Sequence, residues 1–189
     1  MKHGFIKVSA AAPKIRVADI EGNISECVRL IREAAERGAK IIVFPELSVT
    51  GATAGDLFLT KTLLSAAEKA ASDIADTTEE LDIFILLGLP VLLSGKVYNA
   101  AVAMHRGEIL GIVPKSSLSS AETRYFSIPK TVCEVDFAGR ETLFGKELLF
   151  TCSSIDELTV GVSVGSEISA PLSSARFAAV SGATLILNP

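Results

Sequence analysis

Residues 40–47 decide the fold, and they read Lys40-Ile41-Ile42-Val43-Phe44-Pro45-Glu46-Leu47. The unbroken apolar run from Ile41 to Phe44 is typical of a strand that is covered on both faces. Such strands lie in sheets that carry helices, whereas a half-exposed strand alternates apolar and polar residues. Pro45 ends the run, so the pattern predicts a buried strand with the carboxylate of Glu46 just beyond its carboxyl end.

The segments on either side of this strand alternate between strand and helix periods. Phe5 to Ala10 alternates and predicts a first strand, and Asn23 is expected to cap a helix that Gly38 terminates, with Glu26 completing a capping box. Downstream, the pattern predicts helices at 56–76 and 172–181 and strands at 83–87, 97–104, 108–113, 146–150, 159–164 and 184–187. His105-Arg106-Gly107 is expected to form a hairpin turn, and 129–145 shows no clear pattern. We therefore expect an α/β fold, a mixed sheet with helices packed on it.

The composition restricts the class of protein. At 189 residues, 49% apolar and 21% charged, the chain is long enough for one ordered domain with a real core. A net charge of −4 with both signs interspersed argues against a nucleic-acid or anionic-membrane surface. The apolar run Ile83 to Leu93 is too short to cross a bilayer, and the N-terminus lacks a signal-peptide pattern. Three cysteines without metal-ligand spacing argue against a zinc site and for reduced thiols, so we expect a cytoplasmic protein.

Two charged side chains follow predicted strands at the edge where α/β proteins place their ligands. Glu46 follows the buried strand, and a carboxylate there is suited to act as a general base. Lys115 follows the strand 108–113, and a lysine at a strand end can stabilise an oxyanion. Taken alone, each of these residues is better interpreted as a solvated loop side chain.

A third stretch, Gly161-Val162-Ser163-Val164-Gly165, matches the G-x-S-x-G turn that carries the nucleophile of serine hydrolases. In α/β-hydrolases the catalytic histidine follows the serine along the chain. No histidine follows Ser163 in this sequence, so we do not interpret it as a nucleophile.

Taken together and in order, the three stretches resemble the nitrilase, or carbon–nitrogen hydrolase, family, and within it the glutaminase domain of glutamine-dependent NAD synthetases. The resemblance implies an α-β-β-α sandwich and a catalytic glutamate, lysine and cysteine, with no metal or organic cofactor. Glu46 matches the base and Lys115 the lysine, and Glu122 matches a second family glutamate that helps to position the site. In that chemistry the cysteine attacks an amide carbon, the lysine and backbone amides hold the oxyanion, and water hydrolyses the acyl-thioester.

The sequence departs from the family pattern where the nucleophile is expected. The family cysteine aligns with Gly165, and glycine has no side chain with which to form a thioester. Neither neighbouring candidate is expected to replace it: Ser166 needs a stronger base than a carboxylate, and Cys152 is expected at the other end of the sheet.

We therefore expect residues 1–189 to form a nitrilase-like domain, truncated at its C-terminus and without the synthetase half, that is inactive or strongly impaired in glutamine hydrolysis. The resemblance implies glutamine as the small amide, a synthetase domain as partner and a homo-oligomer. Two alternatives stay open: a non-catalytic pseudoenzyme or binding module, and an amidase that acts on another small carboxamide.

Overall fold

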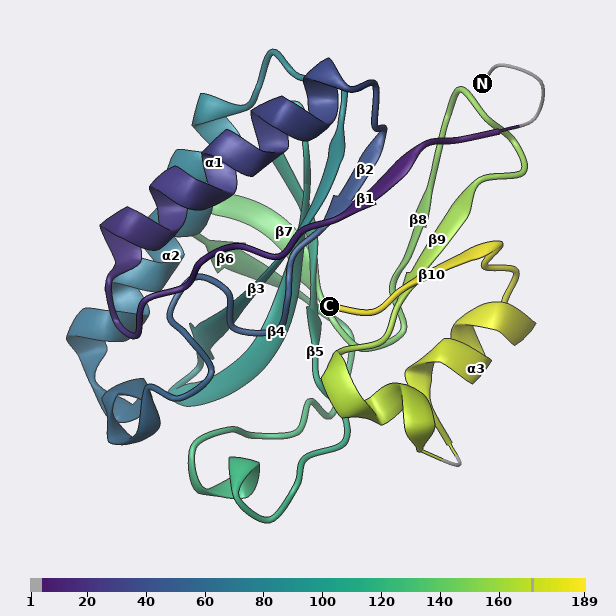
Figure 1. Ribbon diagram of the computed structural model, residues 1–189. Coiled ribbons are helices and arrows are strands. Elements are labelled where there is room, and N and C mark those ends of the chain that lie inside the picture. Colours follow the sequence, from purple (N-terminus) through teal and green to yellow (C-terminus); the bar gives the residue numbers. More distant parts are fainter. Residues whose placement is uncertain (1–4, 171) are drawn as a thin grey trace.

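The computed structural model describes residues 5–170 and 172–189 and contains two sheets with helices on their outer faces (Figure 1). The larger sheet has seven strands in the order β1-β2-β3-β4-β5-β7-β6, and the smaller has three in the order β10-β9-β8. The strands are β1 (Val8–Ala10), β2 (Ile41–Val43), β3 (Phe84–Leu93), β4 (Lys96–His105), β5 (Glu108–Pro114), β6 (Cys133–Phe137), β7 (Arg140–Phe144), β8 (Leu149–Thr151), β9 (Thr159–Val162) and β10 (Leu185–Leu187). The helices are α1 (Ile20–Glu36), α2 (Lys61–Thr77) and α3 (Ser174–Val180), with 3-10 turns η1 (Gly55–Leu59), η2 (Glu122–Arg124) and η3 (Gly165–Ser169).

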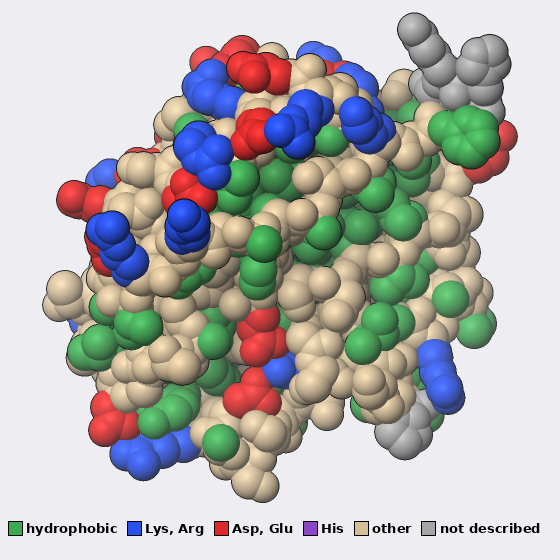
Figure 2. All heavy atoms as spheres, viewed as in Figure 1, with side chains coloured by type: hydrophobic (Ala, Val, Ile, Leu, Met, Phe, Trp, Pro, Cys, Tyr) green, Lys and Arg blue, Asp and Glu red, His purple; other side chains and the backbone are tan. Residues whose placement is uncertain are grey.

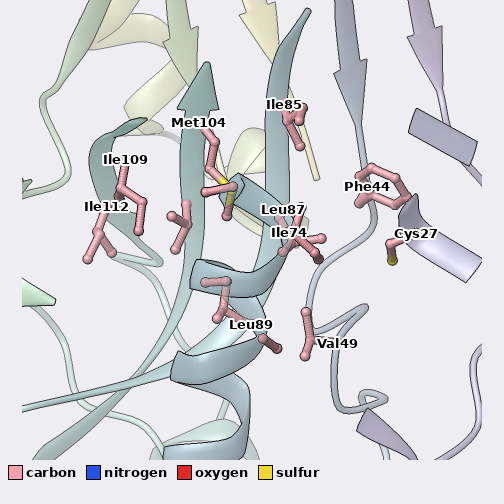
Figure 3. Packing of buried hydrophobic residues seen from close by; sticks show 14 of the residues in the cluster. Cys27, Phe44, Val49, Ile74, Ile85, Leu87, Leu89, Met104, Ile109 and Ile112 are labelled. Carbon is pink, nitrogen blue, oxygen red and sulfur yellow. The ribbon is translucent and has the colours of Figure 1, made fainter. Parts of the chain in front are cut away.

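The helices cover the outer faces, and the two sheets face each other. In Figure 1, α1 and α2 lie on one side of the large sheet and α3 lies on the far side of the small sheet. The core under α1 and α2 is built from β3, β4 and β5, and Figure 3 shows Ile85, Leu87 and Met104 of these strands packed near Ile74 of α2. A second core joins the sheets. It contains Ile41, Leu86, Ala101, Val113, Val160, Val162 and Leu187. The molecule is therefore an α-β-β-α sandwich, as the family resemblance implied, with two sheets in place of the one mixed sheet that the residue pattern predicted.

The strand directions bring several chain segments to one edge. β1, β2 and β3 are mutually parallel, and β9 is parallel to β10. The loops after β2, β5 and β9 carry the polar residues that the sequence singled out. Gly88 of β3 allows the loop after β2 to approach closely, since a β-carbon there would overlap the carbonyl of Pro45 and lie 2.8 Å from Cα of Glu46.

The expected cap of the first helix was wrong. The helix begins at Ile20, and Asp19 is its N-cap, with Oδ1 accepting a hydrogen bond from the Gly22 amide at 3.1 Å. Asn23 is instead 1% exposed inside the helix, where its amide donates to the carbonyls of Arg16 and Val49. Its role is to tie the helix to the loop after β2. The capping box with Glu26 therefore does not form, whereas Gly38 follows the helix with a positive φ of 79°, as expected.

Other element bounds also differ from the prediction. The stretch 129–145 contains the hairpin β6–β7, which turns through Ala138 and Gly139 with φ of 55° and 73°. The helix expected from residue 56 is a 3-10 turn followed by α2, and β3 continues through Pro90 to Leu93, paired with β4. The hairpin at 105–107 is confirmed, with positive φ at both Arg106 and Gly107. None of the described helices is long and apolar enough to cross a membrane.

Candidate active site

A buried ion cluster joins the loops after β2 and β5. Lys115 directly follows β5, its side chain is 3% exposed, and its backbone amide donates to the carbonyl of Asn99 on β4 at 2.8 Å. Nζ of Lys115 donates to Oε2 of Glu46 at 3.0 Å and to Oε1 of Glu122 at 2.6 Å. The structure thus brings together three of the four residues that the sequence predicted for the site.

The electrostatics of the cluster keep Lys115 and Glu122 charged. Burial alone would lower the pKa of Lys115, but hydrogen bonds and charge from Glu122 and Glu46 outweigh it and raise that pKa above its ordinary value. Burial would raise the pKa of Glu122, but hydrogen bonds from Lys115 and Ser119 outweigh it and lower that pKa. With one ammonium between two carboxylates, the cluster has an excess of one negative charge at neutral pH. Figure 2 shows acidic and basic side chains gathered at the centre of the viewed face, between the two helix layers.

Gly165, the fourth predicted residue, faces the same cluster. It begins η3, three residues after the end of β9, with a left-handed φ of 58°. Hydrolases present a nucleophile on a strand-to-helix turn of this kind, and glycine adopts the left-handed φ there without strain. A β-carbon on Gly165 would overlap Oε2 of Glu46 and lie 3.0 Å from Nζ of Lys115. A side chain at this position would therefore project between the carboxylate and the ammonium.

Comparison with known proteins assigns the family. A family model described as carbon-nitrogen hydrolase matches residues 7–189. The chain belongs to the carbon–nitrogen hydrolase family.

Several known proteins are similar to this chain over most of its length. It is 30% identical to a glutamine-dependent NAD(+) synthetase of Mycobacterium tuberculosis strain H37Rv, over 99% of this chain and 28% of that protein. The crystal structure of a glutamine-dependent NAD(+) synthetase from Cytophaga hutchinsonii superposes with a TM-score of 0.83 at 27% identity, over 97% of this chain and 30% of that one. An amidase from Nesterenkonia sp. superposes with a TM-score of 0.71 at 21% identity, over 97% of this chain and 64% of that one, and bears on the fold alone. The chain thus spans less than a third of the length of either synthetase.

Glu167 stabilises this carbon–nitrogen hydrolase site, and its role was not predicted from the sequence. Glu167 is 2% exposed, and its Oε1 accepts from the Val164 amide at 2.8 Å and the Ser174 hydroxyl at 2.7 Å. Its Oε2 accepts from the amide of Ser116 at 2.7 Å, from the Ser116 hydroxyl at 2.8 Å and from the amide of Ser117 at 3.3 Å. One side chain therefore links the turn around Gly165 to the loop that carries Lys115. The sequence signal that could have indicated this role is the position of the glutamate, two residues after the expected nucleophile.

The segment after β10 holds the same turn from the other side. The Gly165 amide donates to the Pro189 carbonyl at 3.0 Å, and the Asn188 side-chain amide donates to the carbonyl of Gly165 at 2.9 Å and to that of Ser163. The backbone of the turn is thus fixed by hydrogen bonds that do not involve a side chain at position 165.

The other nucleophile candidates of this family member lie away from the cluster. Val162 and Val164 point into the core between the sheets, so Ser163 faces the α3 side, where it is fully buried. The Cys152 amide donates to the carbonyl of Leu158, which precedes β9, whereas Gly165 follows that strand. Cys152 therefore lies at the opposite end of the small sheet, as expected. Among the described residues, no group of three His, Cys, Asp or Glu is placed to hold a metal ion.

Proposed function

We propose that this chain is a glutaminase-type carbon–nitrogen hydrolase domain, of the kind found in glutamine-dependent NAD synthetases, that has lost covalent amide hydrolysis at Gly165. The observation that carries the proposal is the position of Gly165, because a side chain there would project between Glu46 and Lys115. The site keeps a base and an oxyanion-stabilising cation but has no nucleophile between them.

The missing side chain removes the central step of the reaction that the family resemblance implies. In that reaction the base takes the thiol proton, the thiolate adds to the amide carbon, ammonia leaves, and water releases the acid from the thioester. Lys115 would stabilise the negative oxygen of the tetrahedral intermediate. Without the thiol no acyl-enzyme forms, and loss of a nucleophile from comparable machinery lowers turnover by on the order of a millionfold.

A second candidate function is binding without turnover. Glu46, Lys115 and Glu122 remain in contact and largely buried, which favours recognition of a small carboxamide by this cluster. In this role residues 1–189 would serve as a pseudoenzyme domain in the cytoplasm, associated with a synthetase domain or with further copies of the chain. The remaining alternative is an amidase for a different small carboxamide. It differs from the inactivated glutaminase and from the binding module because it would hydrolyse its substrate.

Ammonia release from L-glutamine tests the proposal, with the chain measured beside Gly165→Cys and Gly165→Ala. We expect background release from the parent and from Gly165→Ala, and measurable release from Gly165→Cys. The left-handed φ disfavours either side chain by about 1–2 kcal/mol, so the two variants share the same strain and differ in the thiol. The carboxylate of Glu46 must also rotate away, which its flexible side chain allows.

Ammonia release by the unmodified chain would overturn the proposal. A folded but silent Gly165→Cys variant would favour the binding role. Adding Glu46→Gln to Gly165→Cys should abolish the recovered activity, because the thiol then loses its base.

A further inference from the structure

Asn99 on β4 has a buried side chain whose hydrogen-bonding groups are unused. The residue is 1% exposed, and within the described part of the chain neither Nδ2 nor Oδ1 has a hydrogen-bond partner. Burying a carboxamide without partners is unfavourable, and native proteins rarely leave both ends of one unpaired. The side chain therefore points to a ligand group or a bound water that completes it.

The strand register places Asn99 beside Lys115. Ala100 pairs with Pro114, and the Lys115 amide donates to the Asn99 carbonyl, so Asn99 and Lys115 are opposite one another on adjacent antiparallel strands. Side chains of directly opposed residues share a face of the sheet, with β-carbons about 4.5–5.5 Å apart. Two residues along β4, Ala101 belongs to the core between the two sheets. Asn99 thus shares the face on which Lys115 meets Glu46.

We propose that Asn99 is a ligand-binding residue of this site and that its side-chain amide forms hydrogen bonds with a neutral carboxamide bound next to Lys115. The inference rests on the proposed function, because it assumes that the pocket retains a small-molecule ligand. An asparagine side chain presents one acceptor and a donor pair in a plane, which complements the donor and acceptor of another carboxamide.

The charge of the cluster selects the ligand class. Glu46 and Glu122 already exceed Lys115 by one negative charge, so a carboxylate ligand would meet like-charge repulsion in a partly buried site. A neutral amide avoids that repulsion. We expect L-glutamine to bind at least about tenfold more tightly than L-glutamate, since a difference of about 1.4 kcal/mol is tenfold.

The test follows the Asn99 side-chain amide by 15N-resolved NMR, with the resonance assigned by its absence in Asn99→Leu. Titration with L-glutamine, and with propionamide as a minimal amide, should shift this resonance. Asn99→Leu should weaken binding by about tenfold or more. It should also leave Tm unchanged or raise it by about 2–4 °C, because a buried unpaired amide is replaced by an apolar side chain of similar shape.

Ser163→Ala is the matched control, because Ser163 is also buried, has an Oγ without a hydrogen-bond partner among the described residues, and faces the α3 side. It should leave amide binding unchanged. The proposal is overturned if neither amide shifts the Asn99 resonance up to its solubility limit, or if Asn99→Leu lowers Tm, which would reveal a structural partner. Ammonia release by the unmodified chain would instead refute the proposed function. The Asn99 titration would still show whether Asn99 contacts a bound amide, because it does not depend on turnover.

Discussion

Replacing Lys115 with methionine tests whether one cation holds the buried cluster together. Methionine keeps the length and apolar stem of lysine but leaves Glu46 and Glu122 facing each other without a counter-ion. Removing one partner of a buried pair costs about 3–5 kcal/mol. Because the two carboxylates remain 25% and 20% exposed, water screens part of their repulsion, and we expect a loss near 3 kcal/mol, the lower end of that range.

Urea unfolding followed by far-UV circular dichroism measures this loss, which corresponds to a fall in Tm of about 6–12 °C for a domain of this size. Lys69→Met is the matched control. Lys69 is 75% exposed and pairs with Asp73 on the surface of α2, so its removal should change stability by at most about 0.5 kcal/mol.

The loss should also depend on pH in a defined direction. The lowered pKa of Glu122 stabilises the fold above its unfolded pKa, about 4.3, and this contribution disappears as the pH falls. The raised pKa of Lys115 stabilises the fold below about pH 10.4, and this contribution disappears as the pH rises through the folded value. The difference between parent and variant is therefore largest from about pH 5 to pH 10.

Two results would refute this reasoning. One is a Lys115→Met variant that loses less than about 1 kcal/mol at neutral pH. The other is a loss that stays the same at about pH 3.5, where the carboxyl groups of the variant are protonated and no longer repel each other.

Three further expectations concern other parts of the chain. Glu167→Gln should lower stability by about 2–3 kcal/mol in urea unfolding, because the charged acceptor of five hydrogen bonds becomes neutral; an unchanged midpoint would contradict its bracing role. Asn23→Ala should destabilise by about 2–3 kcal/mol and Asp19→Ala by about 1 kcal/mol, and the reverse order would contradict the capping assignment. Cys27, whose pKa is raised to about 12 mainly by burial, should resist a thiol reagent in the native state while the other two cysteines react, and three labelled thiols would refute this.

The elements that local chemistry dictates were predictable from the sequence. The apolar run from Ile41 to Phe44 specified a buried strand because its burial on both faces requires no polar partner. The turn at Arg106 and Gly107 was predictable because a tight hairpin needs positive φ, which glycine adopts freely. These are short-range effects that the sequence shows directly.

Features that depend on distant contacts were not predictable. Asp19 and Asn23 are both good capping residues, and the carbonyl of Val49, 26 residues away, decides between them by accepting from Asn23. The hairpin β6–β7 turns at Ala138, a residue type that rarely adopts positive φ and therefore gives no turn signal. Its strands are fixed by pairing with each other and with β5.

The site was partly predictable for the same reason. Glu46, Lys115 and Gly165 each follow a strand, and their order along the chain matched a known pattern. Asn99 and Glu167 were not part of the sequence pattern that pointed to the site. Whether a polar side chain in a strand or turn is unpaired, or braces two loops, depends on the register between strands that the sequence does not display.

The hydrogen bonds around Gly165 hold the conformation of this turn without the side chain that would carry out the chemistry. Glu167 and Asn188 hold the turn through backbone groups and serine hydroxyls, so these hydrogen bonds form without a side chain at position 165. Folding of this turn therefore does not require a nucleophile at that position. A cysteine introduced at this position would find the backbone hydrogen bonds already formed, and it would require the positive φ to be tolerated and the Glu46 carboxylate to move.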